Sequence, residues 1–399
     1  MAIIYIMIIC RILKKDLKAH ERQIKYLLYV IISMSIIAMI LYELYVQNRI
    51  GWEYGIPYDD DTGWIFRAAT ALKEGMSIDK LYTLVLSSDY DIANRALSFG
   101  NLGQYIYCIW VSSFLYFPKL INIKVNLLAI YIVQILMAVD SGIILTDCLI
   151  KELYMKQRNV RYSWWFIFVA FIICPLIQFN SYKLLRETLF FYMVTHTVCS
   201  CMNHEKRKAL IYFGISIVFR PLIIVLLLPI YIYYLYDEKM GNIVNILLFI
   251  IMSVGVTIVN KIARILGWTY NIGQASLNKM VHLFLFPNFI NQLENFLNLN
   301  KNPSWNVILY FFQSIWNIIY GIVFVFGIIG MKKRKTGYYF WMILFINCLM
   351  IYTIPYSTNS MTVRYKAIYL IPMMYFVSGS MVRFWFGKRK SIIYYGRKK

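Results

Sequence analysis

The sequence predicts an all-α protein, a polytopic integral membrane helix bundle with about ten transmembrane helices. Apolar side chains make up 60% of the 399 residues and charged ones only 15%. The apolar residues lie in continuous blocks, and a bilayer core accommodates about 20 such residues per helix. Lys and Arg gather in short tracts between the blocks, as the positive-inside rule describes. A single transmembrane bundle over residues 26–386 follows.

The net charge of +22 does not indicate a nucleic-acid partner, because the basic residues flank apolar blocks and no separate basic domain is visible. Nearly all of the seven cysteines lie inside apolar blocks, where they fit as small core residues. Four histidines show no metal-ligand spacing, so packing or surface roles are expected for them; they are His20, His196, His204 and His282.

The chain begins with a basic segment, residues 1–25, which is expected in the cytoplasm because six Lys and Arg lie between residues 11 and 25. The first span is expected at Tyr26 to Val46. A polar outer loop, 47–120, follows and holds eight of the nineteen acidic residues. This loop is the longest polar stretch of the chain and faces the outside.

The block from Asn101 to Phe117 is long enough to suggest a span, and the charges decide against it. If both Asn101–Phe117 and Ile121–Ile150 crossed the membrane, the basic tract at 151–161 would lie outside, whereas a single span in this region places the tract inside. We therefore expect Asn101 to Phe117 to be a helix at the outer interface. Pro118 then turns the chain into the second span, Ile121 to Ile150.

The rest of the chain alternates direction between basic inner tracts and polar outer turns. Arg220-Pro221 interrupts a long apolar block and predicts a hairpin, since Pro removes a backbone donor and a mid-bilayer Arg is costly. The second outer loop, 263–304, holds an amphipathic stretch. The expected spans are Trp164–Phe179, Arg186–Met202, Ala209–Phe219, Leu222–Tyr236, Asn242–Ile262, Trp305–Gly330, Tyr338–Tyr356 and Lys366–Phe386. A basic tail, 387–399, leaves both ends in the cytoplasm.

Three adjacent carboxylates lie beyond the outer end of the first span: Asp59, Asp60 and Asp61. They repel one another, which favours a neutralising cation or a raised pKa. Such a group serves as a general base for an acceptor hydroxyl or as an anchor for a divalent cation such as Mg²⁺ or Mn²⁺. A solvated acidic loop is the alternative. The helix that follows, with Trp64 on its apolar face, would hold the carboxylates at the membrane surface.

Four cations are expected on the same outer side: Lys183, Arg186, Arg220 and Arg364. Arg suits a two-pronged grip on phosphate, although a structural pairing is favoured for each cation alone. Glu187 fits equally a second acid of the site or the partner of Arg186.

Two further acids lie within the second span. Asp140 is a functional candidate because it is expected within the membrane, with an inward-facing Arg as the alternative explanation. Asp147 and Lys151, four residues apart, predict an ion pair along one helix face.

These motifs resemble the GT-C superfamily of membrane glycosyltransferases, especially its bacterial lipid-linked-sugar branch, which is related to protein mannosyltransferases and aminoarabinose transferases. The resemblance covers roughly residues 26–236 and the last span. It is carried by DDDTGWIFRAATALKEG at 59–75, an interfacial helix before the second span, RETL at 186–189, FRP at 219–221 and VRYKAIYLIP at 363–372.

The resemblance implies an inverting transfer of sugar from a polyprenyl phosphate or diphosphate carrier to a glycan or lipid acceptor on the extracytoplasmic face. It implies that Asp60 or Asp61 is the base and that the outward Arg residues hold the phosphate. Trp64 and Tyr365 are expected at the substrate.

Two other functions stay open. A repeat-unit polymerase for capsule or O-antigen is a near relative that relies on arginines. A transporter or flippase for lipid-linked sugar is the non-enzyme alternative. High Ile, Tyr and Lys content points to an AT-rich bacterial genome and hence to a bacterial plasma membrane.

Overall fold

The computed structural model describes residues 29–37, 106–107, 109–111, 128–153, 160–174, 177, 181, 187–255, 258, 261, 265, 280–281, 289–298, 305–331, 337–353 and 367–386. These residues are helical apart from short turns, and no strand occurs among them. The predicted all-α class is thereby confirmed for this part of the chain. The basic end segments, 1–25 and 387–399, lie outside it.

The helices match the expected blocks closely. They are α6 Leu128–Glu152, α7 Val160–Ile172, α9 Glu187–Met202, α10 Lys206–Phe219, α11 Ile224–Leu235, α12 Glu238–Ile250, α15 Phe289–Leu297, α16 Trp305–Met331, α17 Tyr338–Thr353 and α18 Ala367–Phe386. A π-helical turn, Ile251–Gly255, extends α12. The amphipathic helix expected in the second outer loop is α15.

The predicted break at Arg220 is confirmed. α10 ends at Phe219, Arg220 adopts extended backbone angles, and a 3-10 turn, Pro221–Ile223, leads into α11. Phe213 stacks on Tyr231 at a centroid distance of 5.6 Å. These two residues are nearly equidistant from the break, so α10 and α11 form an antiparallel hairpin.

Residue contacts fix the direction of neighbouring helices in the first half of the molecule. α7 runs antiparallel to α6, whereas α9 runs in the same direction as α6. The contacts are Asp147 with Trp164 and Gly142 with Phe168 for α6 and α7, and Asp140 with His196 and Lys151 with Asn203 for α6 and α9. This order of directions is the one the basic tracts predict.

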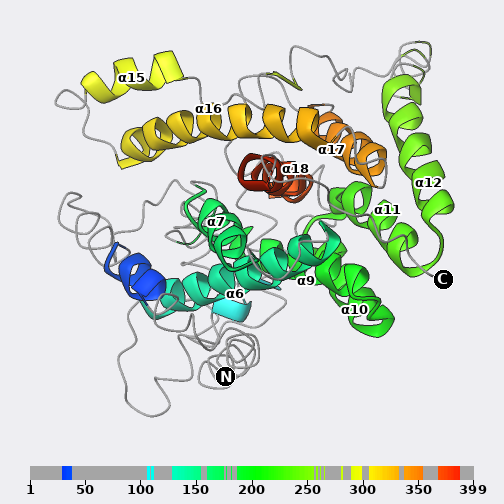
Figure 1. The fold of residues 1–399 in the computed structure, drawn as a ribbon, viewed down its shortest axis with the longest axis horizontal. Helices are drawn as coiled ribbons and strands as arrows, with labels where there is room; N and C mark the ends of the chain where they lie inside the picture. The colour runs from blue at the N-terminus through cyan, green and yellow to red at the C-terminus, as the bar shows by residue number, and fades with distance from the viewer. Residues whose placement is uncertain are drawn as a thin grey trace.

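The helix α18 lies at the centre of the described structure, between α16 on one side and α6, α7 and α9 on the other (Figure 1). Every residue from 369 to 380 is buried. A Cβ placed on Gly327 of α16 would lie only 2.1 Å from the carbonyl oxygen of Phe376. The missing side chain at Gly327 therefore lets these two helices pack backbone to backbone.

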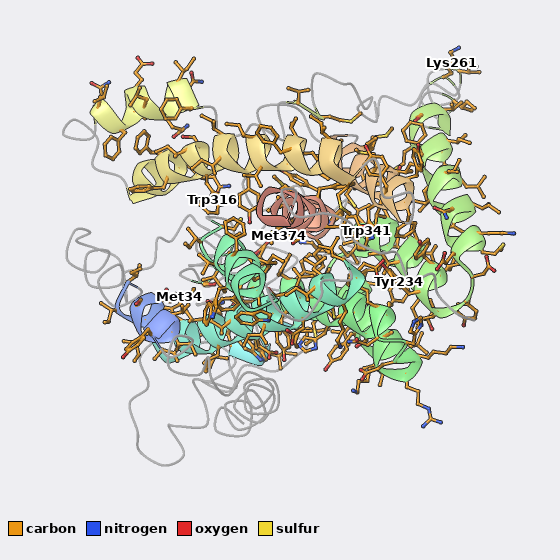
Figure 2. All side chains as sticks on the ribbon, in the orientation of Figure 1. Met34, Tyr234, Lys261, Trp316, Trp341 and Met374 are labelled. Carbon is orange, nitrogen blue, oxygen red and sulfur yellow. The ribbon has the colours of Figure 1, made fainter. Side chains whose placement is uncertain are left out.

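Apolar side chains on α12 and α16 are exposed, in contrast to those of α18. Phe312, Phe326 and Ile329 of α16 and Ile251 beside α12 are each more than half exposed. Figure 2 shows the side chains of α12 projecting at the edge of the structure, with Lys261 beyond them and Met374 and Trp341 near its centre. Large exposed apolar faces of this kind mark surfaces that contact lipid or another apolar partner.

Two described helices are long and apolar enough to cross a membrane, Ile130–Glu152 and Tyr310–Met331. The helices α7, α9, α10 and α11 have only 12 to 16 residues. At 1.5 Å per residue they are shorter than the hydrocarbon core of about 30 Å. The number of membrane spans therefore stays a prediction.

The segment expected at the outer interface, Asn101 to Phe117, is helical where it is described. Tyr107 and Val111 are fully buried, and the amide of Gln134 in α6 donates a hydrogen bond of 2.8 Å to the hydroxyl of Tyr107. The segment thus packs into the core beside α6. Its depth in a membrane remains a prediction.

Candidate functional site

The candidate site is built on the hairpin of α9 and α10. The turn between them places His204 at a φ of 60°, in the left-handed region, which non-glycine residues occupy mainly in turns. The exposed cations Lys206, Arg207 and Lys208 follow this turn. Charged side chains on the two helices make contacts at two positions, called levels below. One level is at the end of the hairpin opposite this turn, and the other is midway along it.

At the far end, Arg220 forms an ion pair with Glu187. The guanidinium Nη2 donates a hydrogen bond to Oε1 of Glu187. Only 12% of the Arg220 side chain and 2% of the Glu187 side chain are exposed. The guanidinium also lies 5.6 Å from the ring centre of Phe190, within the range of a cation–π interaction.

The local sequence explains why Arg220 reaches this position. Because α10 ends at Phe219 and the next residue is Pro221, the backbone at Arg220 leaves the helix in an extended conformation. Glu187 lies in the first turn of α9, where the helix dipole favours a carboxylate. The hairpin thus brings a cation at the end of one helix to an anion at the start of the other.

This pair changes the interpretation of both residues. Arg220 was expected as an outward-facing cation, with a structural pairing favoured for it when taken alone, and Glu187 as a second acid or the partner of Arg186. The structure pairs Arg220 with Glu187, whereas Arg186 lies outside the described residues. Two buried opposite charges stabilise each other chiefly because either charge alone would be costly. An anion that binds Arg220 must therefore compete with Glu187 or bind alongside it.

Midway along the hairpin, Asp140 of α6 contacts His196 of α9. The distance between Asp140 Oδ2 and His196 Nε2 is 3.2 Å, and the two side chains are 1% and 11% exposed. The imidazole ring lies between Tyr192, at 4.3 Å, and Tyr212 of α10, at 4.9 Å. The inward-facing Arg considered for Asp140 is replaced by a histidine that the sequence had assigned to packing or the surface.

At the turn end of the hairpin, Asp147 and Lys151, which the sequence predicted to form an ion pair, each make a hydrogen bond to another helix. The indole Nε1 of Trp164 donates a hydrogen bond of 2.7 Å to Asp147. Lys151 donates one of 3.2 Å to the side chain of Asn203. Both contacts join α6 to a neighbouring helix, which a sequence-local rule for helix pairs cannot anticipate.

The remaining candidate residues lie outside the described residues, namely Asp59, Asp60, Asp61, Trp64, Lys183, Arg186, Arg364 and Tyr365. The divalent-cation site expected at Asp59 to Asp61 therefore stays a prediction. Within the described part of the chain, no group of three or more His, Cys, Asp or Glu side chains is arranged to hold a metal ion.

The five described cysteines fulfil the expected packing role. Cys148, Cys174, Cys199, Cys201 and Cys348 are buried and form no disulfide. None of them contributes to either charged level of the hairpin.

The sequence identified Glu187 and Arg220 as site residues but did not pair them, and it missed His196. The signal for His196 was present: it is the one ionisable residue other than Cys and Tyr in the interior of α9, and a buried carboxylate on a neighbouring helix needs a partner.

Comparison with protein-family models, with curated proteins and with solved structures gives no match to this chain.

Proposed function

We propose that this protein is a membrane glycosyltransferase of the GT-C type. It transfers a sugar or oligosaccharide from a polyprenyl phosphate or diphosphate carrier to a glycan or lipid acceptor. The reaction takes place on the extracytoplasmic face of a bacterial plasma membrane, in the assembly of the cell envelope or a surface polysaccharide. The observation that carries the proposal is the placement of Arg220, held by buried Glu187 at the break between α10 and α11.

The membrane location is supported by the exposed apolar faces of α12 and α16. In water these faces would cost free energy in proportion to their area, whereas lipid acyl chains cover them without that cost. In this proposal both termini lie in the cytoplasm. The α9–α10 turn, with its three adjacent cations, faces the same side, so Arg220 lies at the opposite, extracytoplasmic end.

In the proposed reaction, the aspartate cluster supplies the general base and the arginines bind the phosphate. A carboxylate of Asp60 or Asp61 accepts the proton of the acceptor hydroxyl, whose oxygen bonds to the anomeric carbon of the donor sugar. The bond from that carbon to the carrier phosphate oxygen breaks, and the phosphate leaves with the bonding electrons. Arg220 and Arg186 stabilise the negative charge of the departing carrier.

Glu187 has a specific part in this scheme. It neutralises Arg220 while no carrier is bound and so offsets the cost of a buried guanidinium. A carrier phosphate replaces or shares that partner. Trp64, Lys183, Arg364 and Tyr365 complete the substrate site, and a divalent cation at Asp59 would assist the same phosphate if one binds.

The test is a transfer assay with purified protein and a radiolabelled polyprenyl-phosphate sugar, with and without acceptor. We expect labelled product, a loss of about 10²–10⁴-fold in Asp60→Asn or Asp61→Asn, and a loss of about 10²-fold in Arg220→Lys. Arg207→Lys is the matched control, because Arg207 is exposed near the opposite end of α10. Absence of transfer from every carrier in a panel would refute the proposal.

A repeat-unit polymerase is the second candidate, and the Glu187–Arg220 pair favours it because that reaction relies on arginines. The same assay separates the two. If both aspartate variants retain transfer while Arg220→Lys loses it, the protein is a polymerase.

A lipid-linked-sugar transporter is the candidate from another class. The buried Asp140–His196 pair favours it, since ionisable groups inside a bundle often line a transport path. Movement of a labelled carrier across proteoliposomes without any new glycosidic bond would identify this function.

A further inference from the structure

The contact between Asp140 and His196 is unlike the rest of the described core. Asp140 is fully buried near the middle of α6, and its second carboxylate oxygen, Oδ1, has no hydrogen-bond partner among the described residues. Its only ion-pair partner there is His196. A carboxylate that has left water with so few hydrogen bonds is costly unless a positive charge or a proton accompanies it.

Among the described residues, no Lys or Arg forms an ion pair with Asp140, and the exposed Lys208 of α10 pairs with Glu205. The described side chains of α7, α11 and α18, which pack against α6 or α9, include no Asp, Glu, Lys or Arg. On α6, Asp147 is two turns away and bonded to Trp164. On α9, Glu187 belongs to Arg220. The ionisable rings next to His196 are the neutral phenols of Tyr192 and Tyr212.

Histidine differs from Arg and Lys because it changes charge near neutral pH. With one proton shared between them, Asp140 and His196 form either an imidazolium–carboxylate pair or a neutral acid–imidazole pair. Without that proton, the carboxylate charge is buried beside a neutral ring. The shared proton is therefore what makes the burial of these two groups tolerable.

The His196 side of this pair is more exposed than the Asp140 side. The His196 side chain keeps 11% of its surface exposed. Tyr212, which contacts its ring, is only half-buried, and Lys208, one turn earlier on α10, is exposed. Exposure therefore increases from the pair toward the turn between α9 and α10.

We propose that Asp140 and His196 form a proton-binding site inside the helix bundle, which exchanges its proton with the solvent at the α9–α10 turn. The ligand is the proton itself, bound between Nε2 of His196 and Oδ2 of Asp140. The site does not depend on glycosyl transfer, and it would serve a transferase, a polymerase or a transporter alike.

The chain suits a direct test because it contains only four histidines. In full-length protein with ¹⁵N-labelled histidine, the His196 signals are assigned by their loss in His196→Gln. They are then followed by NMR between about pH 5 and pH 9. We expect these signals to report proton exchange within this range. In Asp140→Asn the pH at which these signals change should differ from that of wild type, because the carboxylate charge next to the ring is removed.

His204 is the internal control, since it is exposed at the α9–α10 turn and its midpoint should be the same in both proteins. Equal His196 midpoints in wild type and Asp140→Asn would overturn the proposal. If Asp140→Asn does not fold, the wild-type titration decides alone. A His196 that keeps one protonation state throughout the range shows a fixed hydrogen bond and also overturns the proposal.

Discussion

The two halves of the described bundle are held together by different chemistry. The α6, α9 and α10 helices meet through charged and polar contacts, including the Glu187–Arg220 and Asp140–His196 pairs. The α16, α17 and α18 helices meet through aromatic rings, such as Trp341 on Tyr375 at 4.9 Å, and through the bare backbone at Gly327. Among the described side chains, buried ion pairs occur in the first half and not in the second.

The largest effect is expected in the polar half. Arg220→Ala should lower the free energy of unfolding by about 3–5 kcal/mol, because it leaves Glu187 buried without its cation. The double variant Glu187→Gln with Arg220→Gln should lose much less, since neither charge remains. Denaturant unfolding in detergent measures both. Equal losses would show that the pair is not a coupled buried ion pair.

The next effect concerns the apolar half. Gly327→Ala should destabilise the protein by about 1–3 kcal/mol, since the added methyl group would collide with the backbone of Phe376 in α18. Gly214→Ala in α10 is the matched control: its added methyl would meet nothing within 4 Å. It should stabilise α10 by about 0.5–1 kcal/mol. Thermal unfolding checks both signs, and a neutral Gly327→Ala would contradict the close helix contact.

A smaller effect should come from a hydroxyl that links the two halves. Tyr320 of α16 donates a hydrogen bond of 2.6 Å to the carbonyl of Ala170 in α7. Tyr320→Phe should cost about 1 kcal/mol. Tyr339→Phe, at an exposed ring, should change nothing measurable in the same unfolding experiment. Equal values for both variants would remove this link.

The smallest effect is expected at the turn between α11 and α12. Backbone N–H groups of Met240 and Lys239 donate to Asp237 and hold the pKa of that carboxyl below its usual value. Its stabilising effect is therefore present above the ordinary Asp range and is lost as the pH falls through the lowered pKa. The protection factor for hydrogen exchange in the first turn of α12, which corrects for the slower intrinsic exchange in acid, should fall on acidification and in Asp237→Ala, but not in Asp237→Asn, which retains the cap.

Much of the fold was predictable because helix ends follow local signals. The cations after His204 mark the start of α10, and Arg220-Pro221 marks its end, so both bounds were close. Lateral contacts were not predictable. The Ile130–Glu152 and Tyr310–Met331 segments have similar mean hydropathy, 1.8 and 2.0, yet the first is largely buried and the second largely exposed.

In the candidate site, too, local features were predictable and contacts between helices were not. Glu187 and Arg220 were chosen for their charge, but their pairing depends on how a hairpin aligns residues 33 positions apart. His196 was missed because its partner, Asp140, lies 56 positions away on another helix. No spacing rule within the sequence predicts such a contact. Residue type and local sequence identify candidate site residues, whereas the packing of the helices determines which of them come into contact.

The central claim is that the Glu187–Arg220 end of the hairpin faces the extracytoplasmic side. Single cysteines at Leu222, beside the α10–α11 break, and at His204, in the α9–α10 turn, test this in intact cells with a membrane-impermeant thiol reagent. The background chain has its native cysteines replaced by alanine. We predict labelling of Leu222→Cys from outside and of His204→Cys only after permeabilisation, and the opposite pattern would contradict the account.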